Sequence, residues 1–173
     1  MRTLYLMRHA KSDWTDEHQD DFDRTLTNRG QRAASLMGIF MTQKGLAPRG
    51  ILCSTAMRTE QTAQRVVAQL PAPPDIVSLP DLYMASADTV FERVTSLGDA
   101  PSPMMVIGHN PSMADFIPLA LTEEALTSEA AQQAMLKFPT AGLAIIQFDC
   151  DRWADIKPRT GQLKRFVAPK GLV

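Results

Sequence analysis

The stretch MMVIGHNP, residues 104–111, passes from a short apolar run into a glycine, His109, Asn110 and Pro111. A fully apolar run of this kind is typical of a strand that is buried on both faces, as in the middle of a parallel sheet. Asn followed by Pro then predicts a helix start, with Asn110 as the cap and Pro111 in the first turn. The stretch therefore predicts a central strand, a loop that carries His109, and a helix to about residue 121.

On both sides of that stretch, short apolar runs alternate with helical patterns along the chain. The other expected strands are residues 3–7, 50–53, 76–79 and 143–148, and residues 153–156 are expected to pair with residues 162–167. The other expected helices are residues 27–44, 55–70, 87–97 and 128–136. This alternation predicts an α/β fold: a three-layer α/β/α sandwich with a mostly parallel central sheet, edged by an antiparallel strand from the C-terminal part.

The helix expected at residues 27–44 has clear end signals. Thr27 is a possible N-cap and Gly45 a stop, as is common where a helix ends. Leu36, Ile39 and Phe40 can share one face of this helix.

Composition restricts the class of protein. A chain of 173 residues fits one domain, residues 1–173, with a single core. Hydrophobic residues make up 45% and charged residues 21%, both near the globular average, so whole-chain disorder is excluded. The net charge of −1, from 18 basic and 19 acidic side chains, argues against a nucleic-acid-binding protein but allows a local cationic pocket.

Two cysteines, Cys53 and Cys150, provide neither a disulfide framework nor a zinc site. The first ten residues lack the apolar core of a signal peptide, and no apolar run is long enough to cross a bilayer. We therefore expect no membrane association and a cytoplasmic protein.

Two of the three histidines, His9 and His109, come directly after expected strands. In an open parallel α/β sheet, ligands bind beyond the carboxyl ends of the strands. Arg8 precedes His9, and Arg58 lies one turn into the helix after the second strand, near the helix end that favours anions. Two guanidinium groups and two imidazoles at one edge would repel one another without an anion, and phosphate suits forked arginine donors.

Three segments resemble the motifs of the histidine phosphatase superfamily, which includes phosphoglycerate mutases and acid phosphatases. Arg8-His9-Ala10 resembles its Arg-His-Gly signature, STAMRTEQTA at residues 54–63 its second motif, and VIGHNP at residues 106–111 its third. Ala10 stands where the superfamily usually has Gly, and it would be strained only at a positive φ, which we do not expect.

Within the superfamily, the chain is most similar to the small SixA-type phosphohistidine phosphatases. RHAKSDW at residues 8–14, DFDR at residues 21–24 and LTNRG at residues 26–30 carry that similarity. The resemblance spans residues 1–112 and, more loosely, the C-terminal strands. It implies a phosphoglycerate mutase-like fold.

The resemblance also implies residue roles. His9 takes the phosphoryl group and passes it to water through a phosphohistidine intermediate. Arg8, Arg58 and His109 complete the catalytic set and bind the phosphate, with Arg24 as a further phosphate ligand. Neither a metal nor a cofactor is expected.

Arg24 has an alternative interpretation, because it follows an acidic segment. That segment contains Asp13, Asp16, Glu17, Asp20, Asp21 and Asp23. Such a run is usually a solvated loop, and Arg24 would then be a surface arginine that pairs with Asp21 or Asp23.

The leaving group bears on the choice of substrate. Cleavage of a phosphate ester benefits from a general acid, and Asp81 is the nearest candidate after the third strand. An Asp after Pro is equally typical of a turn. A phosphohistidine substrate relaxes the need for an acid, so the sequence favours a phosphohistidine-bearing protein as the substrate. The alternatives are a broad phosphomonoesterase acting on small phosphorylated metabolites and a non-catalytic phosphate-binding module.

Two other catalytic classes fit poorly. Cysteine-dependent phosphatases use a Cys-x5-Arg loop rich in glycine, whereas only four residues separate Cys53 from Arg58 and none is Gly. The chain also lacks the HExxH and HxH patterns of metal hydrolases and the Gly-x4-Gly-Lys pattern of a P-loop.

Overall fold

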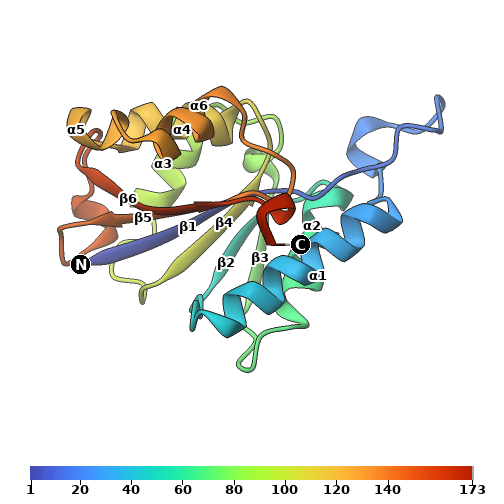
Figure 1. Cartoon of the computed structure of the whole chain (residues 1–173), viewed down its shortest axis with the longest axis horizontal. Helices are drawn as coiled ribbons and strands as arrows, with labels where there is room; N and C mark the ends of the chain where they lie inside the picture. The colour runs from blue at the N-terminus through green and yellow to red at the C-terminus, as the bar shows by residue number, and fades with distance from the viewer. Residues whose placement is uncertain (173) are drawn as a thin grey trace.

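The computed structural model describes residues 1–172 and contains a six-stranded sheet in the order β3-β2-β4-β1-β5-β6 (Figure 1). The strands are β1 (Arg2–Arg8), β2 (Ile51–Ser54), β3 (Ile76–Leu79), β4 (Met104–Gly108), β5 (Leu143–Phe148) and β6 (Gly161–Val167). The α-helices are α1 (Asn28–Gln43), α2 (Met57–Val67), α3 (Ala87–Thr95), α4 (Ser112–Ala120), α5 (Glu123–Leu126) and α6 (Glu129–Leu136). Four short 3-10 helices are η1 (Asp21–Asp23), η2 (Pro80–Leu82), η3 (Trp153–Asp155) and η4 (Pro169–Leu172).

The predicted layer architecture is confirmed. Helices α1 and α2 cover one face of the sheet, and helices α3 to α6 cover the other (Figure 1). Strands β3, β2, β4 and β1 are mutually parallel, whereas β5 pairs antiparallel with β1 and β6 antiparallel with β5. The antiparallel edge is thus two strands wide.

Burial of the middle strands explains why their sequences are continuously apolar. In β1, Leu4 and Leu6 belong to the core beneath α3 to α6, and Tyr5 and Met7 belong to the core beneath α1 and α2. The same alternation occurs in β4, which lies between β2 and β1. Since successive side chains of a strand point to opposite faces, a strand covered on both sides needs apolar residues throughout.

The strand order determines where the site forms. Strands β2, β4 and β1 are adjacent and parallel, so their carboxyl ends meet at one edge of the sheet. Arg8 is the register partner of Gly108, and the backbone N–H of His9 donates to the Gly108 carbonyl oxygen at 3.0 Å. The predicted meeting of the two histidine-bearing loops is therefore confirmed.

One expected pairing is wrong. The first half of the predicted C-terminal pair, residues 153–156, forms η3, and β6 pairs with β5 instead. Trp153 is fully buried, its indole Nε1 donates to the Ala100 carbonyl oxygen at 3.0 Å, and its backbone N–H donates to the Gly98 carbonyl oxygen at 2.8 Å. The segment thus packs its large side chain against the loop before β4 and leaves the sheet edge.

The face of α1 that carries Leu36, Ile39 and Phe40 is only partly buried. Ile39 is 41% exposed and Leu36 only half-buried, whereas Met37 and Met41 are fully buried. The helix lies close to α2 because Gly38 has no side chain, and a Cβ there would lie 2.7 Å from the Val66 carbonyl oxygen. This close approach determines which face of α1 is buried. The predicted N-cap at Thr27 is confirmed, because the Thr27 hydroxyl accepts from the Gly30 N–H.

Helix α4 begins one residue later than its sequence suggests. Pro111 is the N-cap, and the Asn110 side-chain oxygen accepts from the Ala114 N–H at 3.3 Å. Among residues 1–172, no helix combines the length and the apolar character that a membrane span requires.

Candidate active site

A cavity of about 610 Å³ opens at the carboxyl edge of the parallel strands. It is lined by all five residues that the sequence singles out for phosphate chemistry: Arg8, His9, Arg24, Arg58 and His109. They come from the ends of β1 and β4, from the first turn of α2 and from the segment before α1. The fold therefore brings the predicted set together.

His9 is held as a neutral base. Its side chain is buried, and Nδ1 lies 2.7 Å from the Ala10 carbonyl oxygen. A carbonyl oxygen only accepts, so Nδ1 carries the hydrogen and Nε2 keeps its lone pair. The pKa of His9 is lowered to about 3, mainly because the side chain is buried; His109, Arg58 and Arg8 act in the same direction, and the hydrogen bond to Ala10 opposes them. Nε2 is thus available as a nucleophile at neutral pH.

Ala10 adopts ordinary backbone geometry. It is not among the residues with positive φ, which are Met84, Ala141, Arg159, Gly45 and Gly98. Its N–H donates to the Thr62 hydroxyl at 3.0 Å. The expectation that Ala replaces Gly without strain is confirmed.

His109 lies beside His9, with ring centroids 5.2 Å apart. Its Nε2 is 2.7 Å from the hydroxyl oxygen of Ser54, the last residue of β2. Burial lowers the pKa of His109 to about 4, and the Arg58 charge acts in the same direction. In the neutral tautomer in which Ser54 donates to Nε2, the ring hydrogen is on Nδ1, which then serves as a donor.

The arginines are fixed by contacts with the surrounding chain. Arg8 Nη1 donates to the Phe138 carbonyl oxygen at 2.9 Å. Arg24 is buried, its Nη1 donates to the Ser12 hydroxyl at 2.5 Å, and its guanidinium lies 3.4 Å from the centroid of the Trp14 ring. Such fixation presents donors in a set direction, which suits a tetrahedral anion.

Asp21 lines the active-site cavity, a position that the sequence analysis did not predict. Its Oδ1 accepts from Arg24 Nε and Nη2 at 3.1 and 2.9 Å, and its Oδ2 accepts from Arg58 Nη2 at 3.0 Å. The Tyr83 hydroxyl donates to the same Oδ2 at 2.6 Å. Partial burial acts to raise the pKa of Asp21, but the hydrogen bonds from Tyr83, Arg24 and Arg58 outweigh it and hold that pKa well below its usual range.

The Asp21 side chain is 44% exposed, as expected for a solvated acidic loop, but it also pairs with the buried guanidinium groups of Arg24 and Arg58. Arg24 pairs with Asp21 and lines the cavity, which combines the two interpretations of that residue. The one signal in the sequence was the spacing of Asp21 three residues before Arg24. Tyr83 had no such signal.

Comparison with known proteins identifies the family. The family model of the histidine phosphatase superfamily (branch 1) matches residues 4–82. An uncharacterized protein of Mycobacterium leprae is 33% identical over 167 residues, which cover 95% of this chain and 100% of that protein. This chain belongs to the histidine phosphatase superfamily.

Two solved structures support the SixA-type resemblance. A candidate phosphohistidine phosphatase SixA from Agrobacterium tumefaciens is 28% identical, with a TM-score of 0.79 over 97% of this chain and 98% of that one. Another from Nakamurella multipartitia is 27% identical, with a TM-score of 0.81 over 97% of this chain and 96% of that one. Family and site geometry agree on a phosphatase of the SixA type.

This histidine phosphatase presents unpaired donors to its cavity. Three buried nitrogen atoms in the lining have no hydrogen-bond partner within residues 1–172: Arg8 Nε, Arg58 Nε and His109 Nδ1. The fourth buried nitrogen without a partner, Arg2 Nε, belongs to the first residue of β1 and does not line the cavity. An unpaired buried donor is unfavourable, so three of them beside His9 favour an anionic ligand with several oxygens.

Asp81 lies outside this site. It does not line the cavity, and its Oδ2 accepts from Arg93 Nε of α3 at 2.6 Å. Among residues 1–172, Asp21 is the sole carboxylate in the lining, and the lowered pKa keeps it ionised. The histidine phosphatase cavity thus offers no protonated carboxyl group.

Cys53 is also outside the cavity lining. It is fully buried in β2, its thiol donates to the Ser54 carbonyl oxygen at 3.3 Å, and burial raises its pKa to about 12. A thiol of this kind is a poor nucleophile. Within the described residues, no three His, Cys, Asp or Glu side chains gather as metal ligands would.

Proposed function

We propose that this histidine phosphatase hydrolyses phosphohistidine carried by a protein, through a phosphoryl intermediate on His9 and without a metal or cofactor. The observation that carries the proposal is the hydrogen bond from His9 Nδ1 to the Ala10 carbonyl oxygen, which leaves Nε2 unprotonated in the cavity. Neutral, oriented imidazole is what attack on phosphorus requires.

In the first step, Nε2 of His9 attacks phosphorus and the bond from phosphorus to the substrate nitrogen breaks. Arg8, Arg58 and His109 donate to the phosphoryl oxygens and hold them for in-line attack, mainly by positioning and electrostatics. In the second step, water attacks phosphorus, the bond to Nε2 breaks, and the product leaves as dihydrogen phosphate with the oxygen and both protons of that water. His9 returns to its neutral form.

The absence of an acid in the cavity lining favours cleavage of a P–N bond. Asp21 is ionised and Asp81 is paired with Arg93 outside the cavity. A substrate imidazole that is protonated at its second ring nitrogen leaves as a neutral molecule, whereas an alkoxide needs a proton donor. Phosphohistidine is therefore the substrate class that this site suits best.

A broad phosphomonoesterase is the second candidate. The cavity volume of about 610 Å³ lies in the range of small-molecule sites, so it admits a small phosphorylated metabolite. The two candidates differ in the bond that is cleaved, and an assay can separate them directly.

The test compares wild type with His9→Ala in the presence of a chelator. Each receives a phosphohistidine protein and p-nitrophenyl phosphate, and phosphate release is followed over time. Wild type is expected to prefer phosphohistidine, and His9→Ala to lose about a thousandfold or more of that rate. The exposed third histidine provides the control, His18→Ala, which is expected to match wild type.

Each other outcome has a definite meaning. Preference for the ester would make the phosphomonoesterase the function. Equal rates for His9→Ala and wild type would exclude the His9 intermediate, and loss of activity with the chelator would show a metal requirement. No turnover of either substrate by folded wild type would leave a phosphate-binding module.

A further inference from the structure

A second cavity, which we call the side cavity, lies against the active-site cavity and has a volume of about 430 Å³. The two share Arg8, Lys11 and Thr140 in their linings. A ligand held at His9 therefore has a neighbouring recess, and Arg8 lines both cavities. The two proposed reaction steps do not use the side cavity.

The lining of the side cavity is strongly cationic. It contains five basic side chains and no acidic one: Arg8, Lys11, Arg29, Lys137 and Lys170. None of the five forms an ion pair with a carboxylate of residues 1–172. In a chain whose net charge is −1, this is a local excess of positive charge.

The five cations come from separate parts of the chain. Arg8 ends β1, Lys11 follows it, Arg29 lies in the first turn of α1, Lys137 follows α6, and Lys170 lies in η4. Their convergence is a product of the tertiary fold, as no single basic run is present. Like charges gathered in a recess repel one another, and an anion removes that unfavourable energy.

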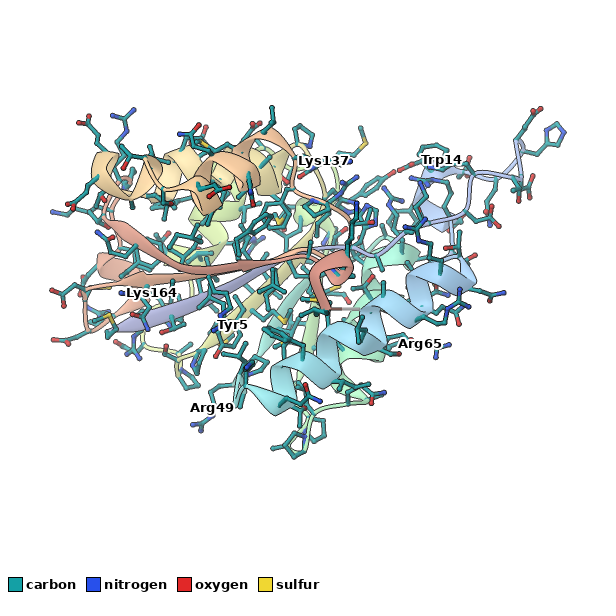
Figure 2. All side chains as sticks on the ribbon, viewed as in Figure 1. Tyr5, Trp14, Arg49, Arg65, Lys137 and Lys164 are labelled. Atoms are coloured by element: carbon teal, nitrogen blue, oxygen red, sulfur yellow. The ribbon has the colours of Figure 1, made fainter. Side chains whose placement is uncertain are left out.

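Two residues of an acidic segment, Trp14 and Asp21, line the active-site cavity, and none of that segment lines the side cavity. The acidic segment, residues 13–23, follows β1 and projects from the body of the molecule (Figure 1). Figure 2 shows Trp14 on this projecting segment, whereas Lys137 lies on the body of the molecule. Acidic side chains are thus concentrated on this segment and basic ones in the side cavity, so an anionic group is favoured in the side cavity.

We propose that the side cavity binds a second anionic group of the phosphorylated substrate, a carboxylate or a phosphate, while the scissile phosphoryl group lies at His9. Arg8 lies between the two groups and contacts both. The proposal rests on the proposed function and narrows its substrate class to molecules, protein or small, that carry a second anion close to the phosphoryl group.

Binding measurements test this without relying on turnover. Titration calorimetry on the full-length His9→Ala variant compares alkanediol bisphosphates of two to six carbons with the corresponding alkyl monophosphates. The bisphosphate of best length is expected to bind about tenfold more tightly than its monophosphate. In a variant with both Lys137→Gln and Lys170→Gln, that preference is expected to fall at least threefold.

The matched control removes two exposed lysines that line neither cavity, in a variant with Lys157→Gln and Lys164→Gln. This control lowers the net charge by the same amount as the Lys137 and Lys170 variant. Because it leaves the lining of both cavities intact, it is expected to keep the preference for the bisphosphate. A second series measures binding of phosphohistidine peptides with two flanking Glu or two flanking Gln residues.

If the Lys137 and Lys170 variant loses the preference for the second anion and the control keeps it, the side cavity is the binding site. A loss in the bisphosphate series identifies the anion as a phosphate, and a loss in the peptide series identifies it as a carboxylate. Equal binding of ligands with and without the second anion overturns the proposal, as does an equal loss in the control. If wild type hydrolysed no substrate while the binding preference held, the proposed function would fail and the anion site would stand.

Discussion

Asp21 binds Arg58 through both its main chain and its side chain. Its carbonyl oxygen accepts from Arg58 Nη1 at 2.6 Å, and its Oδ2 accepts from Nη2 at 3.0 Å. The guanidinium group is thereby fixed on one side, with its buried Nε left for a ligand. A residue of the acidic segment thus orients an arginine that lies 37 positions away in the chain.

The Asp21→Asn variant separates orientation from charge. We expect kcat to fall about tenfold, because a neutral amide holds Arg58 and Arg24 less firmly than a carboxylate does. Inorganic phosphate should inhibit this variant more strongly, since a negative charge has left the cavity. Steady-state kinetics with phosphate as inhibitor measures both effects. Asp23→Asn is the control, and an unchanged kcat for Asp21→Asn would contradict the orienting role.

The stability of the protein should fall as the pH drops below about 6.5. Unfolded histidine takes up a proton near pH 6.5, whereas native His9 and His109 remain neutral until about pH 3 and pH 4. Between these limits the unfolded state binds more protons, so the free energy of unfolding decreases by about 1.4 kcal/mol per pH unit for each histidine.

Urea denaturation at pH 7, 6 and 5 measures this slope. His109→Gln is expected to remove one histidine's share of it. Asp21 adds to the loss only below about pH 4. In that range the unfolded Asp21 carboxylate takes up a proton, whereas the native one, whose pKa is lowered, stays ionised. A slope that is equal in wild type and His109→Gln would mean that His109 is already protonated in the native protein.

Alkylation of thiols should leave the phosphatase active. The Cys53 thiol is fully buried and its raised pKa keeps it protonated at pH 8, so iodoacetamide has no thiolate to attack. In Cys150→Ser, native protein should therefore take up almost no label, and denatured protein one equivalent, as mass spectrometry can measure. Activity that declines in step with labelling of Cys53 would revive a cysteine-dependent mechanism.

The sequence was sufficient for the parts of the site that depend on local order. His9 and His109 each follow an apolar strand, and parallel neighbouring strands end at one edge, so their meeting could be predicted. Asp21 and Tyr83 meet across 62 positions of chain. Asp21 begins the short 3-10 helix η1 and Tyr83 follows the short 3-10 helix η2, and neither segment has a periodic pattern. Nothing local distinguishes such a pair from solvated side chains.

Tertiary contacts also explain the other differences between the predicted and the observed structure. The segment at Trp153 has strand-like composition, and only the packing of its indole against the loop before β4 makes it a 3-10 helix. The five cations of the side cavity are individually ordinary surface residues, and their convergence depends on where α6 and η4 end in space. Tertiary contacts decide both features, so propensity could not show them.

Gly30 tests how closely α1 supports the catalytic loop. A Cβ at Gly30 would lie 2.1 Å from the carbonyl oxygen of Lys11, two residues after His9, and the same oxygen accepts from the Thr27 N–H at 3.0 Å. Gly30→Ala must therefore move the Lys11 main chain or the start of α1. We expect a loss of about 1–3 kcal/mol in the free energy of unfolding, together with a lower kcat. Gly171→Ala, where a Cβ meets nothing within 4 Å, is the control for denaturation and kinetics. If Gly30→Ala kept wild-type kcat despite lower stability, the helix would support the fold without positioning the nucleophile.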